Sequence, residues 1–202
     1  MRNRRDRRHG NKLVVHITNR TVCGLPFICS ALMKMLIAGT MAKAQSLYPA
    51  IICHFLWMGN HYHLILAKRA GTISPFVGYF QGELAKYLKG LMPGFYQGDV
   101  WADRFREQRL YTSEDVIGKI VYLYANPVRA NLVDSIKEYP GLSSYKVFVN
   151  ELGGTLERWV APRLIKPIKG VSESTYIKQL IPQTKRSFGI RCASCLIARW
   201  KT

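Results

Sequence analysis

The sequence predicts an α+β fold, an antiparallel sheet with helices packed on one face. The 202 residues are 48% hydrophobic and 21% charged, which suits one domain with a substantial core. Strand-like and helix-like patterns follow in the order strand, helix, hairpin, helix, strand, helix, which is typical of a sheet with helical cover. The dipeptide Gly59-Asn60 separates two β-rich runs and predicts a tight hairpin turn between them.

Each element is predicted from its own pattern. The strands are apolar or β-branched runs, expected at residues 12–18, 50–58, 61–67 and within 100–111. The first two helices show apolar residues at helical spacing, expected from about 24 to 46 and over 73–92. The third helix is expected over 112–126, with Thr112 or Ser113 as its cap and Pro127 as its end.

Charge divides the chain into three regions. The 30 Lys and Arg residues against 12 Asp and Glu residues give a net charge of +18, which points to a polyanionic partner. A basic arm over 1–12 carries a surplus of 5 and residues 154–202 a surplus of 8, so the ends hold 5 + 8 = 13 of the 18 charges. We therefore predict a compact domain over 13–150 and a basic tail over 151–202. Solubilising tails are the alternative interpretation.

Cysteine usage and hydropathy indicate a cytoplasmic protein. The five cysteines are odd in number and scattered, which favours reduced thiols over a disulfide framework. Cys192 and Cys195 have zinc-ligand spacing, but without a second pair or a nearby histidine they are interpreted as ordinary thiols. The apolar stretch over 25–42 is interrupted by Lys34 and suits a core helix, so no membrane segment is predicted.

His61-Tyr62-His63 is the first candidate for chemistry. Successive side chains of a strand point to opposite faces, so both histidines share a face about 6 to 7 Å apart along the backbone. Two imidazoles placed in this way can converge on a divalent ion. The alternative is a pair of polar residues on a solvated face, but the apolar residues on both sides argue for a buried position.

The third predicted helix carries the second candidate. Asp115, Lys119, Tyr122 and Asn126 are spaced 4, 3 and 4 residues apart and form one polar stripe. Tyr124 points roughly the opposite way and is interpreted as core. The helix therefore offers a phenol nucleophile and an amide oxygen on the same side, although an exposed aromatic residue and a turn-initiating Asn are the simpler interpretations of each alone.

Together these two segments resemble a known family. The segment Met58-Gly59-Asn60-His61-Tyr62-His63-Leu64 resembles the HUH strand of the single-tyrosine transposases, the IS200-like transposase domain. The segment from Tyr122 to Val133 resembles the tyrosine helix of their REP-associated branch. Further similarities, in the family's order, lie at 16–20, 100–105 and 143–145, so the resemblance covers roughly residues 12–147.

The resemblance implies a fold and a chemistry. The fold is ferredoxin-like with the HUH strand central in the sheet, and residues 13–150 are the catalytic domain. His61, His63 and Asn126 are the implied ligands of Mg²⁺ or Mn²⁺, and Tyr122 is the implied nucleophile. The family usually has proline at the position of Gly59 and often glycine at that of Asn131, but Asn tolerates a left-handed conformation.

We expect a DNA nuclease and strand transferase that forms a 5′-phosphotyrosine. Lys119, one turn before Tyr122, is assigned to activate the phenol, with a solvent-facing lysine as the alternative. The expected partner is single-stranded DNA, by resemblance a hairpin in a repeated palindrome, and the protein is placed near the nucleoid; a homodimer is left open. The residues expected to contact DNA are Arg4, Arg5, Arg7, Arg8, Arg20, Arg104, Arg129 and His16. Those available for base stacking are Trp101, Phe105 and Tyr111, although such aromatic residues are more often core.

Other interpretations of the same residues stay open. His16 and His54 are interpreted as mainly structural, because each lies in a predicted strand without a matched partner. A non-catalytic nucleic-acid-binding module explains the charge but not the histidine pair. An HUH replication or relaxase-type nickase shares the histidine strand, but relaxases generally carry a third histidine and an N-terminal tyrosine, and the first tyrosine here is Tyr48.

Overall fold

The computed structural model describes residues 13–26, 30–68, 73–91, 94 and 97–150. The predicted basic arm and basic tail, with Cys192 and Cys195, lie outside these residues. The extents of the arm and the tail therefore stay predictions.

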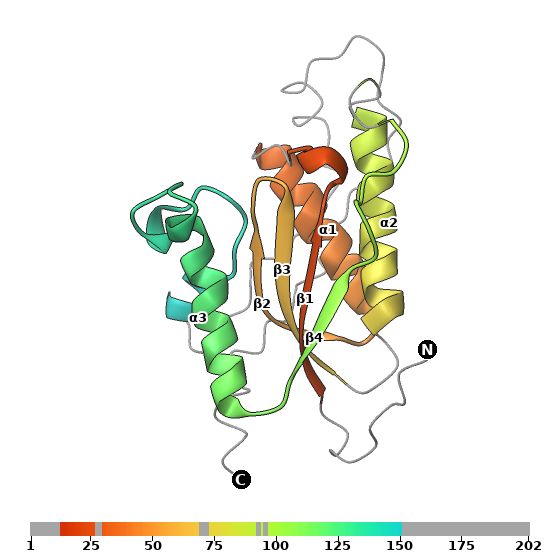
Figure 1. Ribbon diagram of the computed structural model, residues 1–202. Helices are drawn as coiled ribbons and strands as arrows, with labels where there is room; N and C mark the ends of the chain where they lie inside the picture. The colour runs from red at the N-terminus through yellow and green to blue at the C-terminus, as the bar shows by residue number, and fades with distance from the viewer. Residues whose placement is uncertain (1–12, 27–29, 69–72, 92–93, 95–96, 151–202) are drawn as a thin grey trace.

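Four antiparallel strands form one sheet, as the sequence predicts. They are β1 (Leu13–Arg20), β2 (Ile51–Trp57), β3 (His61–Lys68) and β4 (Arg106–Leu110). Their order across the sheet is β2-β3-β1-β4, so β3, which carries the histidine pair, is an interior strand (Figure 1). β4 is shorter than the predicted run because residues 101–104 bend, with Trp101 making only an isolated bridge to Thr21.

Two helices cover one face of the sheet. They are α1 (Ala31–Leu47), which begins after a short 3-10 turn η1 (Val22–Gly24), and α2 (Ile73–Leu91). The Ser30 hydroxyl caps α1 by accepting a hydrogen bond from the Met33 amide at 3.1 Å. Between these helices and the sheet lies the larger apolar core, in which Ile17, Tyr62, Leu64, Phe76 and Phe80 are all fully buried.

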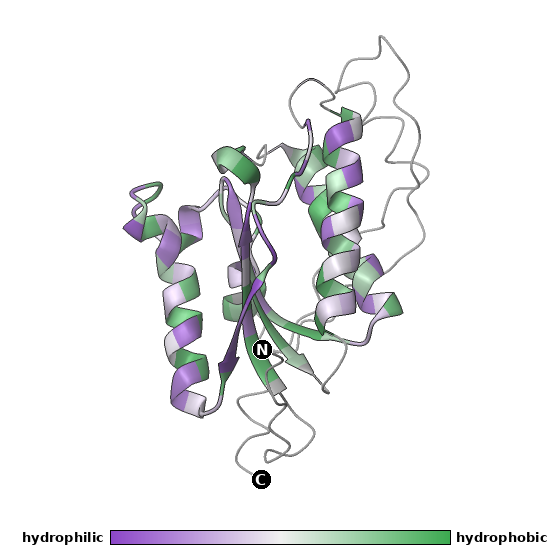
Figure 2. Cartoon of the chain, turned by 45° about the vertical axis from the view of Figure 1, so that its right-hand side comes forward, coloured by the Kyte–Doolittle hydropathy of each residue, from purple (hydrophilic) through white to green (hydrophobic). Residues whose placement is uncertain are grey.

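A third helix, α3 (Ser113–Arg129), covers the opposite face (Figure 1). The expectation of helices on one face therefore describes α1 and α2 but not α3. The reason lies in the strands, whose alternate residues Val14, Ile65 and Leu110 are also apolar and form a second, smaller core with Leu123. Figure 2 shows α3 as a mixture of hydrophilic and hydrophobic residues, as expected for a helix with one buried side.

The start of α3 is as predicted, but its end is not. Thr112 caps the helix, and its hydroxyl and the Asp115 carboxylate each accept a backbone hydrogen bond from the other residue at 3.1 Å. Pro127 was expected to end the helix, but α3 continues to Arg129. Proline has no backbone N–H, so Pro127 cannot donate to the carbonyl of Leu123, four residues earlier. The side-chain amide of Asn126 donates to this carbonyl instead, at 3.4 Å.

Asn131 forms the actual end of α3. Its φ of 53° is left-handed, as the sequence allowed. The Asn131 amide donates to the Val128 carbonyl at 2.9 Å, and the Leu132 amide donates to the Pro127 carbonyl at 3.0 Å. These two bonds are the pair that closes a helix with a left-handed residue at its end.

The chain after α3 returns to the outer edge of β2. It passes a 3-10 turn η2 (Ile136–Glu138) and ends in the short helix α4 (Tyr145–Asn150). On the way, Leu142 accepts from the Trp57 amide at 2.9 Å, and the Ser144 amide donates to the Phe55 carbonyl at 3.0 Å. This covers an edge that would otherwise leave backbone groups unpaired. Among the described helices, none combines the length and hydrophobicity that crossing a bilayer requires.

Candidate active site

Three histidines meet on the face of the sheet that α3 covers. In the β1–β3 register, Thr18 lies opposite His63 and Arg20 opposite His61, so His16 and His63 are diagonal neighbours. The ring centroids of His61 and His63 are 5.1 Å apart, and those of His16 and His63 are 5.3 Å apart. The predicted convergence of His61 and His63 on one face is therefore present, with His16 beside them.

Hydrogen bonds leave one nitrogen of each predicted ligand available. The Nδ1 atom of His61 lies 2.8 Å from the Asn60 side-chain oxygen, and the Nδ1 atom of His63 lies 3.1 Å from Nε2 of His16. Nε2 of His63 is buried and has no hydrogen-bond partner among the described residues. A buried nitrogen without a partner is costly unless another group binds it.

Burial keeps these imidazoles neutral near pH 7. It lowers the pKa of His16 to about 4, with the positive charge of Lys119 acting in the same direction. Burial also lowers the pKa of His63 to about 3, aided by His16, His61 and Lys119, and it lowers the pKa of His61. A neutral imidazole keeps a lone pair on one nitrogen, which is the form that binds a metal ion.

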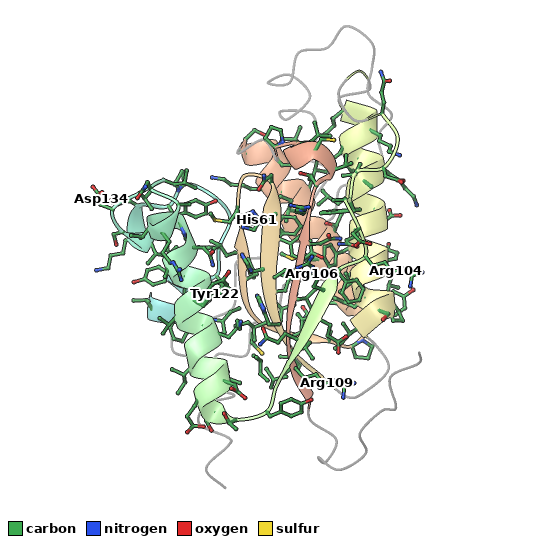
Figure 3. All side chains as sticks on the ribbon, viewed as in Figure 1. His61, Arg104, Arg106, Arg109, Tyr122 and Asp134 are labelled. Atoms are coloured by element: carbon green, nitrogen blue, oxygen red, sulfur yellow. The ribbon has the colours of Figure 1, made fainter. Side chains whose placement is uncertain are left out.

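Tyr122 projects from α3 toward the histidines (Figure 3). Its ring centroid lies 5.8 Å from that of His63 and 6.4 Å from that of His16, while its side chain is 39% exposed. Two cations flank it, with Lys119 Nζ 4.9 Å and Arg129 Cζ 6.0 Å from the centre of the ring. An exposed phenol beside two positive charges can receive an anionic substrate.

Asn126 lies one turn after Tyr122, and its amide is oriented by the helix. The Nδ2 group donates to the Tyr122 carbonyl at 2.8 Å and to the Leu123 carbonyl at 3.4 Å. Because both contacts are to acceptors, the nitrogen must face the helix and the Oδ1 atom is turned away from it. That oxygen is the atom a divalent cation would use.

Two neutral imidazoles and one amide oxygen are donor types that divalent metal ions accept. Among the described residues, no group of three His, Cys, Asp or Glu side chains is placed to hold an ion. Two histidine Nε2 atoms and the Asn126 oxygen are three candidate donors of mixed type, and such sites complete their shell with water or phosphate.

Another buried histidine, His54, ties α3 to the sheet. His54 Nδ1 lies 2.9 Å from the Tyr124 hydroxyl, which lies 3.0 Å from the Ser144 hydroxyl. Ser144 also accepts from the Phe55 amide at 2.8 Å. Tyr124 is therefore core, as predicted, and this buried polar chain joins α3 to β2.

The arginines predicted to contact DNA do not all lie together. Arg129 is beside Tyr122, and Arg20 is exposed at the end of β1 opposite His61. Arg104 is exposed but drawn away from Tyr122, toward the α2 side in Figure 3. The sequence did not single out Arg106, which is exposed on β4 opposite Thr18 and so on the histidine face. The residues Arg4, Arg5, Arg7 and Arg8 lie outside the described part of the chain.

The structure places His16 and two of the aromatic residues inside the fold. His16 is only 6% exposed, and its partner is His63, so the prediction that it has no matched partner is wrong. His54 likewise has a partner in Tyr124. Trp101 and Phe105 pack against the larger core, which supports their structural interpretation. The contact of His16 with His63 escaped sequence reasoning because it depends on strand register, whereas the contact of His61 with Asn60 joins neighbours in the chain.

Comparison with known proteins shows the fold. No protein-family model and no curated protein matches the chain. A REP-associated tyrosine transposase bound to a REP hairpin has a similar structure, with a TM-score of 0.61 and 15% identity over 84% of this chain and 99% of that one. A transposase-like protein from Deinococcus radiodurans R1 has a TM-score of 0.43 and 18% identity over 61% and 96% of the two chains. The first likeness confirms the predicted sheet and helix architecture.

Proposed function

We propose that this protein is a metal-dependent transposase of the REP-associated tyrosine type, which nicks single-stranded DNA and rejoins it. The observation that carries the proposal is the approach of Tyr122 to His63, with ring centroids 5.8 Å apart, beside a buried histidine nitrogen that has no partner in the described part of the chain. A nucleophile and a metal-ligand pair on separate elements meet at one place, as phosphoryl transfer requires.

In this proposal His61, His63 and Asn126 hold the metal ion. When bound, Mg²⁺ or Mn²⁺ neutralises a non-bridging oxygen of the scissile phosphate and orients the phosphate toward Tyr122. The phenol ordinarily has a pKa near 10, so it needs a positive neighbour to act at neutral pH. Lys119, with Nζ 4.9 Å from the ring centre, is assigned to assist the attack of the phenol, and Arg129 is placed to hold the adjacent phosphate.

The proposed reaction exchanges one phosphodiester for another. The Tyr122 oxygen bonds to phosphorus as the bond to the 3′ oxygen breaks; the phenol loses its proton and the departing 3′ oxygen gains one. The products are a 5′-phosphotyrosine and a free 3′-OH, and attack by another 3′-OH reverses the step. No ATP is required, because the phosphotyrosine retains the energy of the phosphodiester.

The proposed substrate is single-stranded DNA that folds into a hairpin. The structurally similar transposase is bound to a REP hairpin, and the net charge of +18 suits a nucleic acid. The exposed positive side chains Arg20, Arg106 and Arg129 surround the histidine face and are placed to contact the DNA backbone.

The test uses hairpin oligonucleotides from the DNA that flanks the gene, labelled at either end, with purified protein and Mn²⁺. A denaturing gel should show the 3′-labelled strand attached to the protein and a shorter, free 5′-labelled strand. Tyr122→Phe should abolish the adduct, whereas Tyr79→Phe, on α2 across the sheet, should form it normally.

Two outcomes would contradict the proposal. An adduct that persists in Tyr122→Phe would assign the nucleophile elsewhere. Salt-sensitive binding of these hairpins without any adduct would instead support a non-catalytic DNA-binding module.

A further inference from the structure

We infer that His16 is a positioning residue that sets which nitrogen of His63 is free to bind the metal ion. This inference rests on the proposed function for the identity of the metal site. It adds a residue to that site that contacts neither the metal nor DNA and acts through the His63 ring.

The contact between the two rings is specific. Nε2 of His16 lies 3.1 Å from Nδ1 of His63, and the ring planes are only 7° apart. His16 is 6% exposed and His63 is 5% exposed, so water has little access to replace this bond. Backbone pairing of β1 with β3 and with β4 fixes His16 from both sides, opposite Ile65 and Gln108.

Tautomer chemistry determines the direction of this bond. A neutral imidazole has one N–H donor and one lone pair. If His63 is to offer the lone pair of Nε2, its proton must be on Nδ1, and that N–H then donates to His16 Nε2. His16 in turn carries its own proton on Nδ1, and its side chain also forms a hydrogen bond with Gln108 on β4.

His61, the other proposed histidine ligand, is oriented by the residue next to it in the chain. Nδ1 of His61 lies 2.8 Å from the Asn60 side-chain oxygen, which can only accept. The proton of His61 is therefore fixed on Nδ1 by its neighbour in the chain. His63 obtains the same tautomer from a residue 47 positions away, and ligands held in this way bind metals more tightly.

The first test is the tautomer of His63 in the metal-free protein. Long-range ¹H–¹⁵N spectra of the histidines, assigned with a His63→Gln variant, should show His63 protonated on Nδ1. In His16→Leu, which removes the acceptor, this preference should be lost. In His16→Gln, whose side-chain oxygen can reach the place of Nε2, it should be retained. Protonation of His63 on Nε2 in the parent protein would overturn the inference.

The second test is Mn²⁺ affinity without DNA, measured by calorimetry. His16→Leu should bind Mn²⁺ about 10- to 100-fold more weakly, and His16→Gln should recover most of the affinity. Ile65→Ala, a buried variant opposite His16, controls for general loosening and should lose stability but retain affinity.

Unchanged Mn²⁺ affinity in His16→Leu would contradict the inference if His63→Ala loses binding. Equal Mn²⁺ binding by the parent and His63→Ala would instead remove the metal site of the proposed function. The tautomer spectra would then still decide whether His16 orients His63.

Discussion

Neighbouring residues of β3 face two different environments. Tyr62 and Leu64 point into the fully buried core beneath α1 and α2, whereas His61 and His63 point toward α3. The first face is held by apolar packing, and the second by a few polar contacts around a tyrosine that is 39% exposed. Because the side-chain period of a strand is two, one strand can stabilise the fold and carry the chemistry at the same time.

The largest expected effect is a difference in stability between variants on the two faces of β3. Leu64→Ala is expected to lower the unfolding free energy by about 2 to 5 kcal/mol, because it opens a cavity in a fully buried site. His61 is half-buried, so His61→Ala should change the unfolding free energy by less than about 1 kcal/mol, while it abolishes Mn²⁺ binding. Urea denaturation and calorimetry measure both effects; a stability loss in His61→Ala equal to that in Leu64→Ala would contradict the division.

Acid should reduce the folding stability that depends on the buried histidines. Burial lowers the pKa of His16 and His54 to about 4 and that of His63 to about 3. The unfolded chain therefore binds more protons below pH 6.5, so this stability is present above pH 6.5 and is lost as the pH falls toward 4.

For His54 alone the expected loss is about 3 kcal/mol by pH 4. Denaturant melts at several pH values measure it, and His54→Gln should flatten the dependence. Constant stability between pH 7 and 4.5 would show that the histidines are accessible to water.

A smaller loss of stability is expected when the hydrogen-bonded chain of His54, Tyr124 and Ser144, which joins α3 to β2, is broken. Tyr124→Phe removes the hydroxyl that lies between His54 and Ser144 and is expected to cost about 1 to 3 kcal/mol. Adduct formation should also slow, since α3 carries Tyr122. The control is Tyr145→Phe, whose ring packs against Tyr124 but is half-buried. Equal melting temperatures for the two variants would exclude a role for the hydroxyl.

Asn126→Ala should have the smallest effect on stability, with a separate effect on the metal. Loss of the bonds from Nδ2 to the Tyr122 and Leu123 carbonyls is expected to cost about 1 kcal/mol. Mn²⁺ affinity should fall because the Oδ1 ligand is lost. Asn126→Gln, which keeps the amide, is expected to retain part of the affinity; full affinity in Asn126→Ala would remove Asn126 from the ligand set.

Local patterns predicted the elements well, because strand alternation, the Gly59-Asn60 turn and the Thr112 cap are each encoded within a few residues. Other features depend on contacts distant in sequence. The pairing of His16 with His63 requires the register of β1 on β3, and no local signal specifies it. Likewise, Pro127 by itself predicts a helix end, but α3 continues past it, and the Asn126 amide donates to the Leu123 carbonyl that Pro127 leaves without its backbone donor.

The sequence pattern predicted helices on one face of the sheet, whereas α3 covers the other face. An amphipathic helix needs an apolar surface, and both faces of this sheet offer one. The apolar residues Val14, Ile65 and Leu110 were visible in the sequence, but their common face appears only once the strand order β2-β3-β1-β4 is known.

The attachment of α3 has a consequence for the kinetics. The start of α3 follows directly from β4, and the chain after its end is hydrogen-bonded to β2 through Ser144. Both ends of the helix are therefore attached to the sheet, and Tyr122 lies beside the histidines of its own chain. If the proposed reaction uses Tyr122 and the histidines of the same polypeptide, its rate should be first order in enzyme. The rate of adduct formation per molecule is then expected to be the same after a hundredfold dilution at saturating DNA.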